Sequence, residues 1–297
     1  MISSNTALTG LLGQPVAHSL SPAMHNAAMT AMKLDFCYLA FPCNDVDLQS
    51  ALAGLRAVGC RGLNVTIPHK RSTALLCREL SPLARRLGAV NTLQPHPNGG
   101  WIGHNTDTEG FLAPLKSVGT DWRGQKSVVV GCGGSARAVA AGLQQLELGQ
   151  ITLVGNRPQS LEACIQDLER GQPAVTSSLK SLLAESPDLS SHLAAARLVV
   201  NTTPVGMVHG QVGSGVEEAL PLGSTAWCKL TNATTLYDLI YTPRPTAWLR
   251  LGRQRGCCTL DGLEMLVHQG AAALRIWLER ENIPLEIMRQ AAEAALS

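Results

Sequence analysis

Hydrophobic and polar positions repeat with two different periods along the first third of the chain. Short apolar or alternating runs are typical of strands, and apolar residues spaced three or four apart are typical of helices. The expected strands are 8–13, 36–41 and 62–67, and the expected helices are 22–32 and 45–58. Strands that alternate with helices predict a mostly parallel sheet covered by helices.

The strand expected at 62–67 carries polar side chains towards its end. Its apolar residues alternate with Asn64 and Thr66, which predicts one buried and one polar face. Pro68 cannot donate the next ladder hydrogen bond and ends the strand. Lys70 follows, where a helix would begin, at the edge where open α/β sheets bind ligands. Lys70 is therefore a candidate for chemistry, and a solvated surface lysine is an equally good interpretation.

A second set of strands and helices follows a predicted hairpin between 89–94 and 101–104 and a helix that begins near Thr108. Residues 126–130 include three consecutive valines, which are typical of a buried strand. The further expected elements are a helix at 136–148, strands at 151–154, 198–201 and 236–241, and helices at 261–278 and 284–296. These elements predict a second parallel sheet and a helical C-terminal segment.

The turn after the strand at 126–130 has the spacing of a dinucleotide-binding loop. Gly131-x-Gly133-x-x-Ala136 follows a buried strand and opens a helix, and this context makes the motif specific. The first glycine permits a tight turn, and the second lets backbone amides approach a diphosphate. The helix N-terminus then supplies donors for the phosphates. An ordinary βα turn is the alternative interpretation.

The end of the next strand indicates the type of cofactor. A protein that binds NAD ordinarily places Asp or Glu there to bind the ribose hydroxyls. This chain has Gly155, Asn156 and Arg157 instead. A guanidinium can pair with a 2′-phosphate that a carboxylate would repel, so the sequence favours NADP.

Composition excludes several classes of partner. The net charge is +2 and only 4% of the 297 residues are aromatic, which argues against a nucleic-acid-binding surface. No targeting leader and no long apolar run is apparent, so we expect no membrane partner and a cytoplasmic location. The 9 cysteines lack chelating spacing and are expected to be reduced, and no metal site is expected. No interface signature stands out, and a monomer or a homodimer is expected.

Two further polar clusters have a structural and a functional interpretation. Ser19 and Ser21 precede Pro22, with Ser21 a natural N-cap, and free amides and hydroxyls there would suit a carboxylate. Asn91 and Asp107 lie in polar segments around the predicted hairpin. Taken alone, Ser21 and Asp107 are each better explained as helix caps.

Taken in order, these motifs resemble those of the shikimate dehydrogenase family over essentially the whole chain. The shared motifs are Ser19-x-Ser21, Asn64-x-Thr66-x-x-x-Lys70, Gly88-Ala89-Val90-Asn91-Thr92, Asn105-Thr106-Asp107, the glycine loop, Asn156-Arg157, the segment 201–207, the segment 238–241 and Gly262-Leu263-x-Met265-Leu266-x-x-Gln269.

The resemblance implies an α/β fold with two domains. A mainly parallel α/β substrate domain is expected to comprise 1–107 plus 245–297, because a C-terminal helical segment returns to it. A Rossmann-type NADP domain is expected to comprise 108–244.

The resemblance also implies the reaction and the residues that serve it. The activity is the reversible NADPH-dependent reduction of 3-dehydroshikimate to shikimate, in aromatic amino acid biosynthesis, with Lys70 and Asp107 flanking the reacting hydroxyl. Its implied substrate-binding residues are Ser19, Ser21, Asn64, Thr66, Asn91, Tyr241 and Gln269. Its implied cofactor-binding residues are Gly131, Cys132, Gly133, Gly134, Ser135, Asn156, Arg157, Leu239 and Gly262.

Departures from the family pattern and two alternatives bear on this interpretation. The family's Asn-Arg-Thr loop ends in Pro158 here, and a basic residue often found four positions after the arginine is Leu161, which leaves Arg157 as the main phosphate-binding residue. A quinate/shikimate dehydrogenase that uses NAD shares the architecture, but the missing acid after Gly155 argues against it. A non-catalytic NADP-binding module would be expected to lack Lys70 or Asp107, and both are present.

Overall fold

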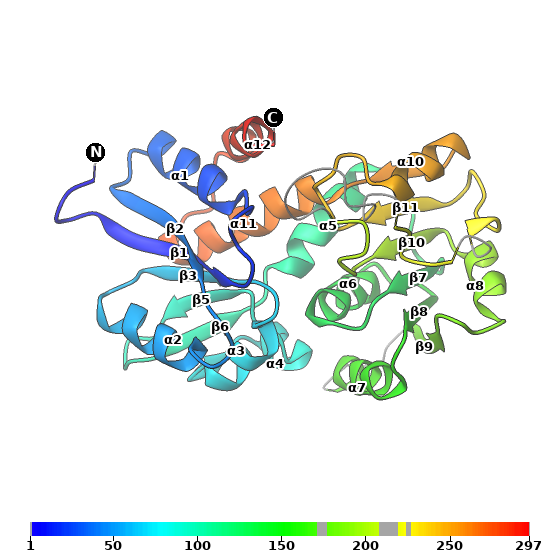
Figure 1. The fold of residues 1–297 in the computed structure, drawn as a ribbon, viewed down its shortest axis with the longest axis horizontal. Coiled ribbons are helices and arrows are strands. Elements are labelled where there is room, and N and C mark those ends of the chain that lie inside the picture. The colour runs from blue at the N-terminus through cyan, green and yellow to red at the C-terminus, as the bar shows by residue number, and fades with distance from the viewer. Residues whose placement is uncertain (1, 171–176, 208–218, 224–226, 297) are drawn as a thin grey trace. The chain divides into compact units, whose positions relative to one another are not determined.

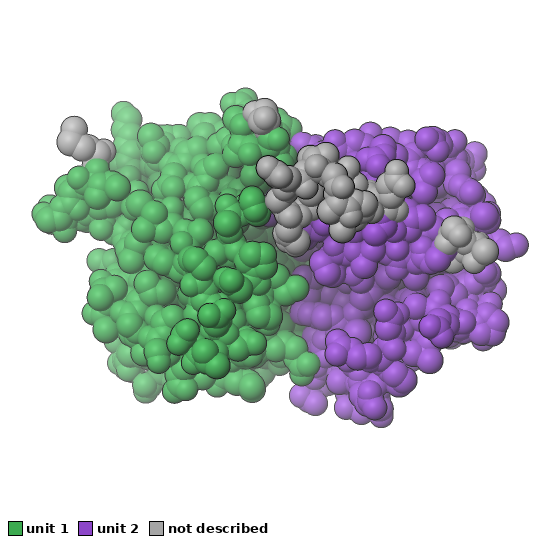
Figure 2. Space-filling model, viewed as in Figure 1, with its two compact units in different colours: residues 1–110, 266–297 green, residues 111–265 purple. Residues whose placement is uncertain are grey.

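The computed structural model describes residues 2–170, 177–207, 219–223 and 227–296. The chain divides into two compact units. The first comprises Met1–Gly110 and Leu266–Ser297, and the second comprises Phe111–Met265 (Figure 2). No described helix is both long enough and apolar enough to span a membrane.

The first unit is built on a six-stranded sheet with the order β2-β1-β3-β5-β6-β4 (Figure 1). Strand β1 pairs in parallel with β2 and β3, and β3, β5 and β6 are antiparallel neighbours, as the predicted hairpin requires. The elements are β1 Ala7–Gly13, α1 Ser21–Ala31, β2 Phe36–Pro42, α2 Leu48–Ala57, β3 Gly62–Val65, α3 Lys70–Leu76, β4 Glu79–Leu80, α4 Pro82–Leu87, β5 Thr92–Pro95, β6 Trp101–His104 and α12 Leu285–Ala294.

Strand β3 differs from the strand that the sequence predicted. It ends at Val65 rather than at residue 67, and all four of its residues are buried. Ile67, expected on the buried face, is 57% exposed, whereas Asn64, expected on a polar face, is buried. Both faces of β3 are covered, so burial does not alternate along it, and Ile67 lies beyond the end of the strand.

Three short elements lie between β3 and β5, and of these the sequence predicted only the start of a helix at Lys70. Helices α3 and α4 and strand β4 are each too short to show a hydrophobic period. Helix α4 carries local signals instead, since the Ser81 hydroxyl accepts from the Ala84 amide and Gly88 ends the helix in the left-handed region. Helix α3 has the greater consequence, because it begins at Lys70.

The second unit contains a six-stranded parallel sheet with the order β12-β11-β10-β7-β8-β9, the strand order of a Rossmann fold (Figure 1). Its elements are β7 Lys126–Val130, α6 Gly134–Gln145, β8 Gln150–Gly155, α7 Pro158–Glu169, β9 Ser178–Leu183, α8 Leu189–Ala195, β10 Leu198–Asn201, β11 Thr235–Asp238, α10 Ala247–Gln254 and β12 Cys258–Leu260. Helices α5 Asp107–Ser117 and α11 Gly262–Leu278 cross the boundary between the units. The α/β fold class is thus confirmed.

The unit boundary differs from the domain boundary that the sequence analysis drew at residue 245. Strand β12 pairs in parallel with β11, so the chain from 245 to 265 belongs with the second sheet. Pairing of this short strand has no signal in the local sequence. The strand expected at 236–241 is also shorter, because β11 ends at Asp238.

The cysteines and the possible metal ligands are distributed as follows. All the cysteines are free, and Cys43, Cys60 and Cys164 are buried among apolar side chains. Within the described part of the chain, no group of three or more His, Cys, Asp or Glu side chains is arranged to hold a metal ion.

Candidate active site

Lys70 and Asp107 form an ion pair in the first unit. Each is the first residue of a helix, Lys70 of α3 and Asp107 of α5. Lys70 Nζ donates to Asp107 Oδ2 at 2.6 Å, and the side chains are only 17% and 6% exposed. Burying two charges costs solvation energy that their attraction often does not recover, so such a pair is poor evidence for stability and a good candidate for chemistry. The interpretation of Lys70 as a solvated surface lysine is therefore wrong, because its side chain is largely buried and paired with Asp107.

Asn91 connects this pair to the surrounding groups. Its amide Nδ2 donates to Asp107 Oδ1 at 2.8 Å and lies 3.3 Å from Gln269 Oε1 of α11. Its Oδ1 accepts from the backbone amide of Thr106 at 2.7 Å. The structure therefore brings together Lys70, Asp107, Asn91 and Gln269, although Gln269 is far away in the sequence.

The carboxylate of Asp107 does not cap helix α5. Asp107 is already the first residue of that helix, and its two carboxylate oxygens accept from Lys70 Nζ and Asn91 Nδ2. Asn105 holds the backbone just before the helix, because its Oδ1 accepts from the Asp107 amide at 3.1 Å while its Nδ2 donates to the Ala89 carbonyl at 3.0 Å. The interpretation of Asp107 as a cap is therefore wrong. Both of its oxygens are available to Lys70 and Asn91.

Asn64 is held in one orientation beside this network. Its Nδ2 donates to the Asn91 carbonyl at 3.2 Å and to Thr92 Oγ1 at 3.1 Å. Its Oδ1 accepts from Tyr38 Oη at 2.9 Å. Thr66 follows β3, half-buried, and its backbone amide donates to the Leu12 carbonyl. Sequence reasoning missed Tyr38, and the one signal for it was a phenol in an apolar strand that must find a partner when buried.

Ser19 and Ser21 lie at the start of α1, but the predicted cap is wrong. The helix begins at Ser21, Leu20 is the capping residue, and no side-chain cap bond forms. The Ser21 amide instead donates to Ser19 Oγ at 3.2 Å. Ser21 is buried, and its carbonyl contacts His25 Nδ1 at 2.9 Å. Burial lowers the pKa of His25 to about 4, which leaves this imidazole neutral at pH 7.

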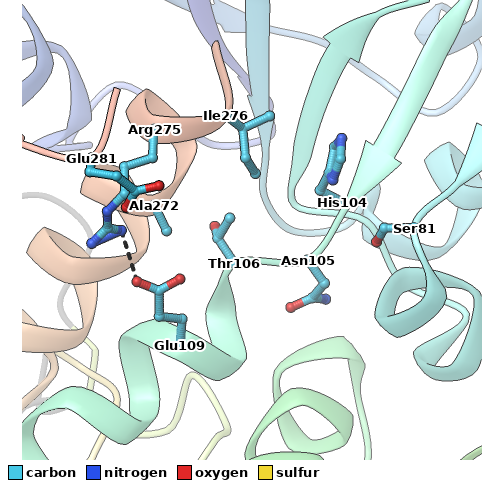
Figure 3. A pocket seen from close by; sticks show the side chains of 9 residues that line it. All are labelled: Ser81, His104, Asn105, Thr106, Glu109, Ala272, Arg275, Ile276 and Glu281. Carbon is cyan, nitrogen blue, oxygen red and sulfur yellow. Dashed lines mark hydrogen bonds and ion pairs between the residues drawn. The ribbon is translucent and has the colours of Figure 1, made fainter. Parts of the chain in front are cut away.

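A cavity of about 480 Å³ lies in the first unit, next to this network (Figure 3). It is lined by Ser81, His104, Asn105, Thr106, Glu109, Ala272, Arg275, Ile276 and Glu281. An ion pair between Arg275 and Glu109 joins α11 to α5 at 2.8 Å on its wall (Figure 3). None of the residues expected to hold substrate lines this cavity.

In the second unit, the glycine loop fits a diphosphate. Gly131 has φ +116°, and a Cβ there would lie 2.3 Å from Thr202 Oγ1, so only glycine fits. A Cβ at Gly133 would meet no atom within 4 Å, which shows that the loop faces open space. Helix α6 begins at Gly134, so the amides of Gly134 and Ser135 have no intrahelical partner. Cys132 lies within the same loop and is half-buried.

Asn156 and Arg157 lie exposed between β8 and α7. Within the part of the chain that the structure describes, the Arg157 side chain has no hydrogen bond or ion pair. Leu161, the other position of interest, is only 3% exposed and contacts Gly155. A side chain at 161 therefore points into the core and not towards a phosphate on the surface.

The second unit also contains the last three expected site residues. Leu239 and Tyr241 follow β11, and Gly262 is the first residue of α11. A Cβ at Gly262 would lie 2.0 Å from the Leu239 carbonyl oxygen, and the Gly262 amide donates to the Ile240 carbonyl. The structure thus brings Leu239 and Gly262 together. Burial raises the pKa of the Tyr241 phenol.

Comparisons with known proteins agree with this geometry. Residues 11–93 match the family model of the shikimate dehydrogenase substrate binding domain, and residues 262–293 match that of the shikimate 5′-dehydrogenase C-terminal domain. A shikimate dehydrogenase (NADP(+)) from Synechocystis is 46% identical, over 98% of this chain and 96% of the relative.

Solved structures give the same result. Shikimate 5-dehydrogenase from Thermus thermophilus, in complex with NADP(H) and shikimate, is 33% identical with a TM-score of 0.82 over 98% of this chain and 100% of that one. Quinate dehydrogenase from Corynebacterium glutamicum, in complex with NAD, is 29% identical with a TM-score of 0.82 over 97% of this chain and 99% of that one. By its full-length relatives and its two matching family models, the chain belongs to the shikimate dehydrogenase family.

Proposed function

We propose that this protein catalyses the reversible reduction of 3-dehydroshikimate to shikimate with NADPH. The observation that carries the proposal is the pairing of Lys70 with Asp107 at 2.6 Å, on a chain whose full-length relatives are shikimate dehydrogenases of the NADP type. A non-catalytic nucleotide-binding module would have no use for a sequestered amine held by a carboxylate.

The chemistry requires a proton at the ketone oxygen, because the hydride is added to the ketone carbon and leaves the negative charge on that oxygen. When bound, NADPH supplies that hydride to the ketone carbon. Lys70 Nζ donates the proton to the developing alkoxide, or accepts it in the direction of oxidation. Asp107 orients the ammonium group through the 2.6 Å contact, and Asn91 fixes the second carboxylate oxygen.

The substrate is held by polar groups with distinct tasks. The hydroxyls of Ser19 and Ser21 bind its carboxylate at the start of α1. Asn64, Thr66, Asn91, Gln269 and Tyr241 bind its hydroxyl groups. The shared network of Asn64, Asn91 and Gln269 supports this assignment, since amides held in fixed orientations give the selectivity that a polyol requires.

The cofactor is held by the second unit. The amides of the loop Gly131, Cys132, Gly133, Gly134 and Ser135 bind the diphosphate, and Asn156 and Arg157 bind the adenosine ribose with its 2′-phosphate. Leu239 and Gly262 approach the nicotinamide. In this assignment the unit Met1–Gly110 with Leu266–Ser297 is the substrate-binding domain, and Phe111–Met265 is the NADP-binding domain.

A single assay tests the function. Oxidation of shikimate and of quinate is followed spectrophotometrically with NADP and with NAD, and the combination of shikimate and NADP is expected to give the highest kcat/KM. Preference for quinate with NAD would instead assign the chain to the quinate/shikimate type. Binding of NADPH without turnover of either acid would contradict the catalytic proposal.

We also propose an oligomeric state and a cellular location. The protein is expected to be a monomer or a homodimer that binds no nucleic acid, and to be located in the cytoplasm. Size-exclusion chromatography with light scattering measures the oligomeric state, and fractionation of the source cells measures the location.

A further inference from the structure

We propose that Arg137 is a positioning residue for the cofactor diphosphate, acting through the backbone of the glycine loop. The proposal rests on the proposed NADP binding and extends it to a side chain that never touches the cofactor. Arg137 is 1% exposed, in the first turn of α6, directly behind Gly131-x-Gly133.

The guanidinium of Arg137 joins the glycine loop to helix α7. Its Nη1 donates to the Cys132 carbonyl at 2.6 Å and lies 3.3 Å from the Gly133 carbonyl. Its Nε and Nη2 face Asp167 Oδ2 of α7, each at 2.9 Å. The fork of donors on arginine matches both a carboxylate and a pair of carbonyls, which an ammonium group does not.

These bonds determine which way the loop amides face. In a trans peptide the C=O and the following N–H point in opposite directions. The carbonyls of Cys132 and Gly133 are turned towards Arg137, so the amides of Gly133 and Gly134 point away from it. A Cβ built on Gly133 would meet no atom within 4 Å, so the loop has open space at this residue. The loop therefore presents donors, and not acceptors, to a diphosphate.

The charge of Arg137 is difficult to explain by stability alone. Asp167 compensates it, but a buried ion pair is often no more stabilising than apolar residues of the same volume. Arg170 also pairs with Asp167 but lies on the surface: its Nη1 is 3.6 Å from Asp167 Oδ1, and its side chain is 71% exposed. Only Arg137 contacts both Asp167 and the loop carbonyls among the residues that the structure describes.

Ligand fragments separate this role from a general effect on folding. ADP-ribose carries the diphosphate without a 2′-phosphate, and adenosine 2′-monophosphate carries the 2′-phosphate without a diphosphate. In Arg137→Met, the Kd values of ADP-ribose and of NADP should rise together, on the order of tenfold to a hundredfold, as expected for lost orientation of bonds to a charged group. Adenosine 2′-monophosphate lacks the diphosphate that the loop binds, so its Kd should stay within about twofold of the wild-type value. A twofold change in Kd corresponds to less free energy than one typical hydrogen bond contributes.

Two further variants complete the comparison. Arg170→Met removes the same side chain from the same carboxylate without a loop contact, and it should leave all three Kd values unchanged. Arg157→Ala should show the reverse pattern, with weaker binding of adenosine 2′-monophosphate and unchanged binding of ADP-ribose. Arg137→Met leaves Asp167 buried without its partner and could unfold the protein. The double variant Arg137→Met with Asp167→Leu removes both charges, and it should show the same rise in the Kd values of ADP-ribose and NADP relative to that of adenosine 2′-monophosphate.

Wild-type binding of ADP-ribose by Arg137→Met or by the double variant would overturn the proposal. So would an equal loss for all three ligands, which would indicate a purely structural role. These binding measurements require no turnover. A wild-type protein that binds NADP but does not oxidise shikimate would therefore contradict the proposed function and leave the role of Arg137 open to the same test.

Discussion

Replacing Lys70 by methionine and Asp107 by asparagine, singly and together, tests whether these residues act as one unit. Both changes preserve the side-chain size. Lys70→Met removes the proton donor, whereas Asp107→Asn keeps an oxygen for Asn91 Nδ2 and removes the charge that faces the ammonium group at 2.6 Å.

The structure sets the expected magnitudes. General acid–base catalysis contributes roughly 10² to 10⁴ in rate, so Lys70→Met should lower kcat by about a thousandfold, or about 4 kcal/mol. Two unit charges at 2.6 Å attract by about 6 kcal/mol at an effective dielectric constant of about 20, before desolvation is subtracted. The net contribution of a charged hydrogen bond is roughly 1.5–3 kcal/mol, so Asp107→Asn should lower kcat about tenfold to a hundredfold.

The double variant distinguishes a unit from two independent groups. If Asp107 acts by orienting Lys70, its loss has little further effect once the amine is gone, and the coupling should be about 2 kcal/mol. The assay measures kcat and KM for shikimate with saturating NADP. Arg275→Met and Glu109→Gln form a matched control, because this pair also joins two helices of the first unit at 2.8 Å but is more exposed. Additive losses in kcat for Lys70 and Asp107 would refute the reasoning.

Four further substitutions give separate tests. Arg157→Ala should raise the KM for NADPH about tenfold or more and leave that for NADH unchanged, because only NADPH has the 2′-phosphate; an equal change for both would contradict the assignment. Gly262→Ala should lower the unfolding free energy by about 1–3 kcal/mol or more, measured by urea denaturation, because its Cβ would lie 2.0 Å from the Leu239 carbonyl oxygen. The pKa of His25 is lowered from 6.5 to about 4, so the unfolded chain binds the extra proton and the wild type should lose up to about 3 kcal/mol of stability as the pH falls through that window. His25→Gln should lack this acid-dependent loss of stability. If the unfolding free energies of the wild type and of His25→Gln fell in parallel as the pH is lowered, His25 would not be the source of the loss. Tyr237→Phe should keep or slightly raise the melting temperature, because the buried Tyr237 hydroxyl has no hydrogen-bond partner in the described structure and its removal leaves the stacking on Phe111 in place; a fall of several degrees would contradict this.

Much of the fold could be predicted from local sequence, and the failures share a cause. The valines of β7 and the glycines after them predicted a strand, a turn and a helix, because each signal lies within a few residues. Helix α4 was missed because it is short, and the placement of 245–265 was missed because β12 joins its sheet through a partner at a distance in the chain. The burial of Asn64 also depends on its neighbours, since a strand covered on both faces shows no alternation.

The candidate site shows the same division. The sequence pointed to Lys70 by its place just after a strand end, and the family resemblance supplied the roles of Asp107, Asn91 and Gln269. It left two interpretations open for several of them, as cap or as functional group. Only the structure removed the ambiguity, because Asp107 and Ser21 are each the first residue of their helices and not the capping residue before them, and the Asp107 carboxylate bonds to Lys70 and Asn91.

Periodicity along the chain was enough to predict the class of fold, and the order of the motifs was enough to recognise the family, whose resemblance supplied most of the candidate residues. The tertiary structure alone decided which of those residues touch, and it added Tyr38 and Arg137, whose roles depend on partners that the fold supplies. The physical reason is that a hydrogen bond or an ion pair requires atoms within about 3 Å of each other, whereas the chain order fixes only which atoms are present.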